Sequence, residues 1–212
     1  MAIVNEEYGA YYFDGKQPET NHSREHDLYT YTAYAGKHTV TVARGDSVIY
    51  LGQDASVAMW YAGPVVVDSE YMAVVIRGYH CGNKSMDLKQ AVNLPYVNGC
   101  ATRQLFPPER IGDPTFQQLT IPPFTSEQVH HIHPTTRVVY VHSGRGYSIV
   151  GQSEKTDEVE LLPGMVVVLD PMSPHHFRTE GESLTVLPVH VFSSTPASME
   201  SNHPMFNGTK EV

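Results

Sequence analysis

The stretch His130-His131-Ile132-His133-Pro134-Thr135-Thr136-Arg137 holds the pattern that decides the fold of this chain. Side chains alternate between the two faces of an extended strand, so His131 and His133 are expected to point to the same side. Two imidazoles on one face can bind one metal ion, because neutral imidazole is a common metal ligand. The glycines of Val141-His142-Ser143-Gly144-Arg145-Gly146 follow and predict a tight hairpin.

A third imidazole is available further along the chain. Gly164 begins a Val-rich run, residues 165–169, that has the composition of a buried β-strand. A proline-bounded turn follows this run and carries His175. Because turn geometry can shift the strand register by one residue, the neighbouring His176 is an alternative third ligand.

These stretches resemble the paired sequence motifs of the cupin superfamily. In that family a glycine, an H-x-H pair, a glutamate and a glycine are followed by a second glycine, a short strand, a P-x-G turn and a histidine. The resemblance covers roughly residues 106–194, and it implies a cupin double-stranded β-helix, or jelly roll, with three histidines as metal ligands. The matching residues here are His131, His133, Gly144, Gly164 and His175.

Two departures from the family pattern bear on function. Arg137 stands where the glutamate ligand is expected, and Asp170 and Met172 stand where the proline and glycine of the turn are expected. A third neutral ligand in place of a carboxylate leaves the metal centre one unit more positive, which favours an anionic bidentate ligand such as an enolate, thiolate or carboxylate. The resemblance points the same way, since cupins that lack the glutamate include thiol dioxygenases, diketone-cleaving enzymes and gentisate-type dioxygenases that use Fe(II).

The three histidines do not by themselves choose the metal. Imidazole binds Fe, Zn, Ni, Cu and Mn, so the cofactor is expected to be a divalent metal, with Fe(II) favoured and Zn, Mn or Ni as alternatives. A facial set of three ligands on an octahedral ion leaves three positions open, enough for a bidentate substrate together with dioxygen. This count favours an Fe(II) oxygenase.

Arg137, His190 and Tyr140 are the candidate catalytic residues. Arg137 stands at the position of the missing glutamate ligand and therefore on the same face of the strand. Its guanidinium is expected to point into the barrel and hold a substrate carboxylate. The alternative is that it turns to the rim and pairs with Glu127 or Glu160. His190 lies on a core strand and could shuttle a proton, or be a buried histidine with a structural partner. Tyr140 could line the pocket or simply pack.

Composition favours an all-β, water-soluble protein. The chain of 212 residues has 15 prolines, 16 glycines and 13 tyrosines, and its Val-rich runs are short and bounded by turn residues. The net charge of −9 argues against nucleic acid or an anionic membrane as a partner. No charged leader or long apolar run is present, so a cytoplasmic location is expected, and without an export signal Cys81 and Cys100 are expected to be two thiols.

The glycines that interrupt the predicted strands recur at a spacing near 110 residues. This repeat predicts two tandem barrels. The expected units are a degenerate domain over residues 1–90, a linker over 91–105, a metal-binding cupin domain over 106–194 and a C-terminal tail over 195–212, with the first 25 residues largely loop. In this register the first unit has Ser23, Glu25 and Ser56 at the ligand positions, so no metal is expected there. The alternative is that residues 1–90 extend one larger sandwich.

Three functions remain open at this stage. The favoured hypothesis is an Fe(II) dioxygenase that acts on a small anionic or chelating substrate. The second is a non-oxidative metalloenzyme, an isomerase, lyase or decarboxylase that uses Zn, Mn or Ni as a Lewis acid. The third is a small-molecule-binding cupin without catalysis. A homodimer is expected, because cupin barrels commonly pair through their sheet edges.

Overall fold

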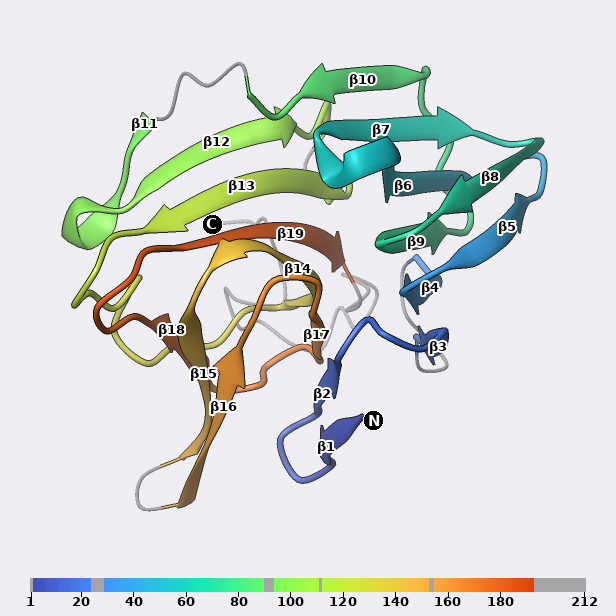
Figure 1. Ribbon diagram of the computed structural model, residues 1–212. Coiled ribbons are helices and arrows are strands. Elements are labelled where there is room, and N and C mark those ends of the chain that lie inside the picture. The colour runs from blue at the N-terminus through green and yellow to red at the C-terminus, as the bar shows by residue number, and fades with distance from the viewer. Residues whose placement is uncertain (1, 24–28, 90–93, 111, 153–154, 193–212) are drawn as a thin grey trace, which may run out of the picture.

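The computed structural model describes residues 2–23, 29–89, 94–110, 112–152 and 155–192, and this part of the chain is all-β, as predicted (Figure 1). Two 3-10 turns, η1 (Gln53–Ala55) and η2 (Val97–Gly99), are its helical elements. None of the helices described here has the length and apolarity that crossing a bilayer requires. Glu25 and the predicted tail over 195–212 lie outside the described residues.

The first half of the chain builds a six-stranded antiparallel sheet in the order β10-β7-β6-β9-β4-β3 and a two-stranded sheet of β5 and β8. The larger sheet consists of β3 (Glu19–His22), β4 (Tyr31–Ala35), β6 (Ser47–Leu51), β7 (Val57–Ala62), β9 (Met72–Ile76) and β10 (Lys84–Asp87). The smaller sheet consists of β5 (His38–Val42) and β8 (Val65–Ser69).

The second half builds an eight-stranded sheet in the order β1-β2-β17-β14-β19-β13-β12-β11 and a three-stranded sheet in the order β16-β15-β18. The large sheet consists of β1 (Ile3–Asn5), β2 (Ala10–Phe13), β11 (Leu94–Pro95), β12 (Ala101–Phe106), β13 (Thr115–Ile121), β14 (Thr135–Gly144), β17 (Val166–Leu169) and β19 (Leu184–Phe192). The small sheet consists of β15 (Gly146–Gln152), β16 (Lys155–Leu161) and β18 (His175–Arg178).

Each large sheet buries side chains on both of its faces. On β14, Val138 and Tyr140 pack into one apolar cluster together with residues of the six-stranded sheet, whereas Val139 and Val141 pack into a second cluster on the opposite face. A third cluster fills the space between the six-stranded sheet and β5–β8. Strands buried on both faces read as continuous apolar runs, which explains why the sequence shows little polar alternation there.

The first 25 residues were wrongly expected to be largely loop. They hold β1, β2 and β3, because Tyr12 and Phe13 are buried and give β2 a place beside β17. Likewise β12 begins within the segment predicted as a linker. The pairing of β2 with β17 therefore joins the start of the chain to the sheet of the second half, and the division into two domains stays a prediction.

The cluster between the two large sheets can be tested at Phe116, which is fully buried there. Phe116→Ala should lower the free energy of unfolding by about 3–5 kcal/mol, because it removes a large apolar side chain from a packed core. Chemical unfolding followed by the fluorescence of Trp60, the single tryptophan, measures this change. Val66→Ala is the control, since Val66 is 61% exposed and should shift stability by less than about 0.5 kcal/mol. Equal effects of the two variants would contradict the packing described.

Candidate metal centre

His131 and His133 lie in an irregular segment just before β14, not on a regular strand as the H-x-H pattern predicted. Pro134 has no N–H to donate to a ladder, and β14 begins only at Thr135. His131 is held by a single antiparallel bridge to His175, in which the His131 N–H donates to the His175 carbonyl at 3.1 Å and the His175 N–H donates back at 2.9 Å. This bridge fixes the two ligand-bearing segments against each other.

His175 is the first residue of β18 and follows a tight turn. Met172 in that turn has a φ of 64°, the left-handed conformation that the family's glycine adopts without strain and that methionine rarely does. The Met172 N–H donates to the His133 carbonyl at 2.7 Å, and the Ser173 N–H donates to the Asp170 carbonyl at 3.2 Å. These hydrogen bonds hold the turn in place although its glycine is missing, and the turn aims His175 inward.

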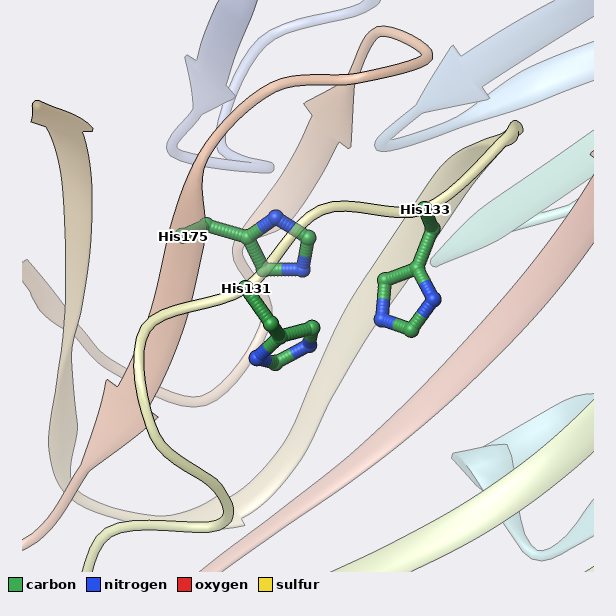
Figure 2. Close-up of side chains that lie close together, drawn as sticks. All are labelled: His131, His133 and His175. Carbon is green, nitrogen blue, oxygen red and sulfur yellow. The ribbon is translucent and has the colours of Figure 1, made fainter. Parts of the chain in front are cut away.

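The three imidazoles converge on a common space (Figure 2). The centroid of the His131 ring lies 4.5 Å from that of His133 and 4.8 Å from that of His175. Nδ1 of His131 donates to the Val129 carbonyl and Nδ1 of His175 donates to the Ser173 carbonyl, each at 2.7 Å. A proton on Nδ1 leaves the lone pair of Nε2 free, so both rings present a ligand nitrogen inward.

These residues fit a divalent metal ion. Nε2 of His131 and Nε2 of His133 are buried and have no hydrogen-bond partner among the described residues, although each is a strong acceptor. One ligand nitrogen from each ring lies within 4.8 Å of the other two. Two nitrogens on one ion are at most about 4.2 Å apart, because a metal–nitrogen bond is about 2.1 Å long. Small side-chain shifts therefore suffice to bring all three onto one ion.

The electrostatics keep the three rings neutral, which is the form that binds metal. Burial lowers the pKa of His133 to about 2 and that of His175 well below its ordinary value. Burial also lowers the pKa of His131, although its bond to the Val129 carbonyl partly opposes the shift. The positive charge of Arg137 lowers all three further.

Arg137 lines the cavity beside the histidines, and of its two predicted partners Glu127 is the one whose charge acts on it. A guanidinium nitrogen lies 3.4 Å from Nε2 of His175, within reach of a weak hydrogen bond. Burial lowers the pKa of Arg137 to about 10, opposed by Glu127, so the guanidinium stays charged at neutral pH. Glu160 is not its partner, because that carboxylate pairs with Arg145.

A cavity of about 580 Å³ opens beside this cluster. It is lined by strands β12, β13, β14 and β19 and by the segment that carries His133. The lining includes Arg137, His190 and Glu127. Glu127 is 3% exposed, and its Oε1 accepts a hydrogen bond from the Phe177 N–H at 3.3 Å. Burial raises the pKa of Glu127, while Arg137 and the bond from the Phe177 N–H oppose the rise.

The remaining candidates divide between the cavity and other places. His190 faces Arg137 across the β14–β19 pair and lines the cavity, with Nε2 buried and unpartnered. Tyr140 does not reach the cavity: it lies on the opposite face of β14 and packs against Tyr71, which corrects its prediction as a site residue. His176 also points away, with its Nδ1 2.8 Å from Nδ1 of His130.

Cys81 and Cys100 are buried and form no disulfide, and neither lines the cavity. Burial raises the pKa of both thiols, to about 11 for Cys81, so they are unreactive side chains of the core.

Sequence reasoning missed two residues of this cavity. Glu127 was considered only as a rim partner for Arg137, because a lone glutamate in a loop carries no pattern. Thr115 was not considered at all, although its Oγ1 is buried without a partner in the cavity wall. The residues beside Thr115 lie on neighbouring strands. The alternation of side chains within one strand does not reveal which strands are neighbours in the sheet.

Comparison with known proteins agrees with this geometry. Residues 117–192 match the family described as Cupin domain. This segment therefore matches a cupin domain. The cupin domain spans β13 to β19 and contains all three histidines. No curated protein matches the sequence significantly.

Solved structures share the fold over most of the chain. Protein Ylba from E. coli is 12% identical, with 92% of this chain and 95% of that chain covered and a TM-score of 0.63. A structural-genomics target from Pseudomonas aeruginosa is 10% identical, with 94% of each chain covered and a TM-score of 0.66. The 7S globulin of Momordica charantia is 11% identical, with 85% and 83% covered and a TM-score of 0.51. At these identities the likeness shows the fold alone.

The buried neutral histidines predict how stability depends on pH. His190 has a pKa well below its ordinary value, first because of burial and then because of Arg137. In the unfolded chain it takes up a proton below about pH 6.5, whereas the folded chain does not, so stability falls as the pH drops below that value. Each such histidine contributes a slope of up to about 1.4 kcal/mol per pH unit.

Urea unfolding of metal-free protein at pH 7.0 and pH 5.5 measures this loss. The free energy of unfolding should differ less between the two pH values in His190→Gln than in the wild type, by about the contribution of one histidine. This holds whatever the variant does to absolute stability. An unchanged difference would show that His190 takes up its proton over the same pH range in the folded and unfolded chains, which would contradict its lowered pKa.

Proposed function

We propose that this cupin is a metal-dependent enzyme, an Fe(II) dioxygenase that acts on a small anionic, chelating substrate. The observation that carries the proposal is the meeting of three neutral imidazoles with the guanidinium of Arg137, 3.4 Å from Nε2 of His175, at one end of a cavity. The positive charge of Arg137 beside the ligand set disfavours a bare metal ion. It favours a metal ion that is bound together with an anion. The site is therefore suited to a metal and an anion together.

His131, His133 and His175 would hold the metal. Held by these residues, Fe(II) would supply the electrons for reaction with dioxygen and would act as a Lewis acid toward a chelating substrate. Arg137 binds the substrate carboxylate through two parallel N–H donors and so sets its orientation. The guanidinium then exchanges its weak contact with His175 Nε2 for a stronger one with an anion.

Two further groups can hold protons in the cavity. Glu127 is a buried carboxyl with a raised pKa, able to donate a proton to a substrate oxygen or accept one from a substrate hydroxyl or thiol. His190 is neutral and offers its unpartnered Nε2. The enclosing strands limit water around these groups, which strengthens each charged contact.

Glu127 also favours a second candidate function. A buried acid–base group beside a metal site suits a non-oxidative isomerase, lyase or decarboxylase that uses Zn, Mn or Ni as a Lewis acid. The two candidates differ in their need for oxygen, so one experiment separates them.

Oxygen uptake after anaerobic metal loading tests the proposal. The Fe(II)-loaded protein should consume dioxygen with at least one of four substrate classes, thiols, β-diketones, hydroxyaromatic acids or hydroxylated aliphatic acids, and the Zn(II)-loaded protein should not. Arg137→Met should raise KM about 10- to 100-fold, because a hydrogen bond to a charged group contributes about 1.5–3 kcal/mol. Arg145→Met is the matched control, since Arg145 is an exposed arginine paired with Glu160, and its KM should stay at the wild-type value.

Absence of uptake with every class would overturn the dioxygenase. Turnover that is the same with and without oxygen would favour the non-oxidative enzyme instead. Equal effects of the two arginine variants would remove Arg137 from substrate binding.

A further inference from the structure

Besides Nε2 of the proposed metal ligand His133, three polar atoms in the wall of the cavity have no hydrogen-bond partner among the described residues. They are Nε of Arg137, Nε2 of His190 and Oγ1 of Thr115. Each atom is shielded from solvent, and each residue belongs to a different strand: β14, β19 and β13. Buried polar atoms normally find a partner, because leaving one unpaired is costly. Three in one wall indicate that something else supplies their partners.

Strand register places these three residues in a row. His190 is the cross-strand partner of Arg137 on one side and of Thr115 on the other, and the three strands are neighbours in the order β14-β19-β13. Directly opposed residues point to the same face of a sheet, and neighbouring strands are about 4.8 Å apart, so the row is roughly 10 Å long. It starts at Arg137, beside His175, and leads away from the metal ligands.

The wall continues with polar side chains at the far end of the row. Gln117 follows Thr115 on the same face of β13, and Gln104 is its partner on β12; both line the cavity. Amide and hydroxyl groups both donate and accept hydrogen bonds, which matches substrate hydroxyls. A flat hydrocarbon or aromatic chain along this wall would leave these groups unpaired.

We propose that the row Arg137–His190–Thr115, continued by Gln117 and Gln104, binds a small aliphatic carboxylate that carries hydroxyl groups along its chain. The carboxylate lies at Arg137, next to the metal ligands, and the hydroxyls extend toward Thr115 and the two glutamines. This inference rests on the proposed function in placing the substrate at the same site, and it names the substrate class. A site that hydrogen-bonds substrate hydroxyls discriminates strongly against analogues that lack them.

Calorimetric titration of metal-free full-length protein tests the proposal without any turnover. The probes are threonate and gluconate, the same-length acids butanoate and hexanoate, and sorbitol, which has the hydroxyls but no carboxylate. At least one hydroxylated acid should bind about tenfold or more tightly than its unsubstituted counterpart, and sorbitol should bind more weakly than gluconate. The titration uses no metal, so its outcome does not depend on whether the oxygen-uptake experiment succeeds. Equally, a failed titration would not decide whether the protein is a dioxygenase.

Thr115→Val locates the effect. This variant keeps the shape of the side chain but loses its hydroxyl, so it should weaken the hydroxylated acid about threefold to tenfold and leave the unsubstituted acid unchanged. Its melting temperature should be equal or higher, because an unpaired buried hydroxyl is removed. Thr120→Val is the matched control on the other face of β13, where Oγ1 bonds Thr185 Oγ1 at 3.1 Å; it should not change binding.

Two results would overturn the proposal. One is equal binding of hydroxylated and unsubstituted acids at both chain lengths. The other is a lower melting temperature for Thr115→Val with unchanged binding, which would show that Thr115 has a structural partner instead of a ligand.

Discussion

Two backbone hydrogen bonds between His131 and His175 support the rest of the site. They join an irregular segment, which has no strand ladder of its own, to the start of β18. Without them the segment would still be tied to β18 by the bond of the Glu127 N–H to the Phe177 carbonyl, but His131 itself would lose its backbone pairing with β18. With them, the ring of His131 faces that of His175 at 4.8 Å, and the contact of the Met172 N–H with the His133 carbonyl extends the same support to His133. Backbone pairing therefore positions the segments that carry all three ligands.

Charge then limits what this ligand set can do. Arg137 adds a positive charge beside three neutral imidazoles, where related cupins have a negative glutamate. The guanidinium disfavours a cation on its own and favours an anion close to it. The buried carboxyl of Glu127 lies close enough to Arg137 for each group to shift the pKa of the other. A three-histidine cluster beside a guanidinium and a buried carboxyl would suit several metalloenzyme chemistries, which is why oxygen dependence is the deciding property.

The sequence predicted the parts of this site that follow from local patterns. The H-x-H pair, the glycine before the Val-rich run and the histidine after the turn indicated the three imidazoles and the parity of Arg137. Tyr140 failed because β14 is buried on both faces, so burial alone could not tell the cavity face from the face packed between the sheets. Thr115 and the first strands were missed for a related reason: their partners, β19 and β17, are distant in sequence and are set by sheet order.

X-ray absorption spectroscopy of the Zn(II)-loaded protein tests the central claim most directly, because it counts imidazole ligands around the ion whatever the reaction is. The account predicts three imidazole nitrogens at about 2.0–2.1 Å in the wild type and in His176→Ala, and two in His175→Ala. An unchanged ligand set in His175→Ala, or the loss of a ligand in His176→Ala, would contradict the convergence of His131, His133 and His175 on one metal ion.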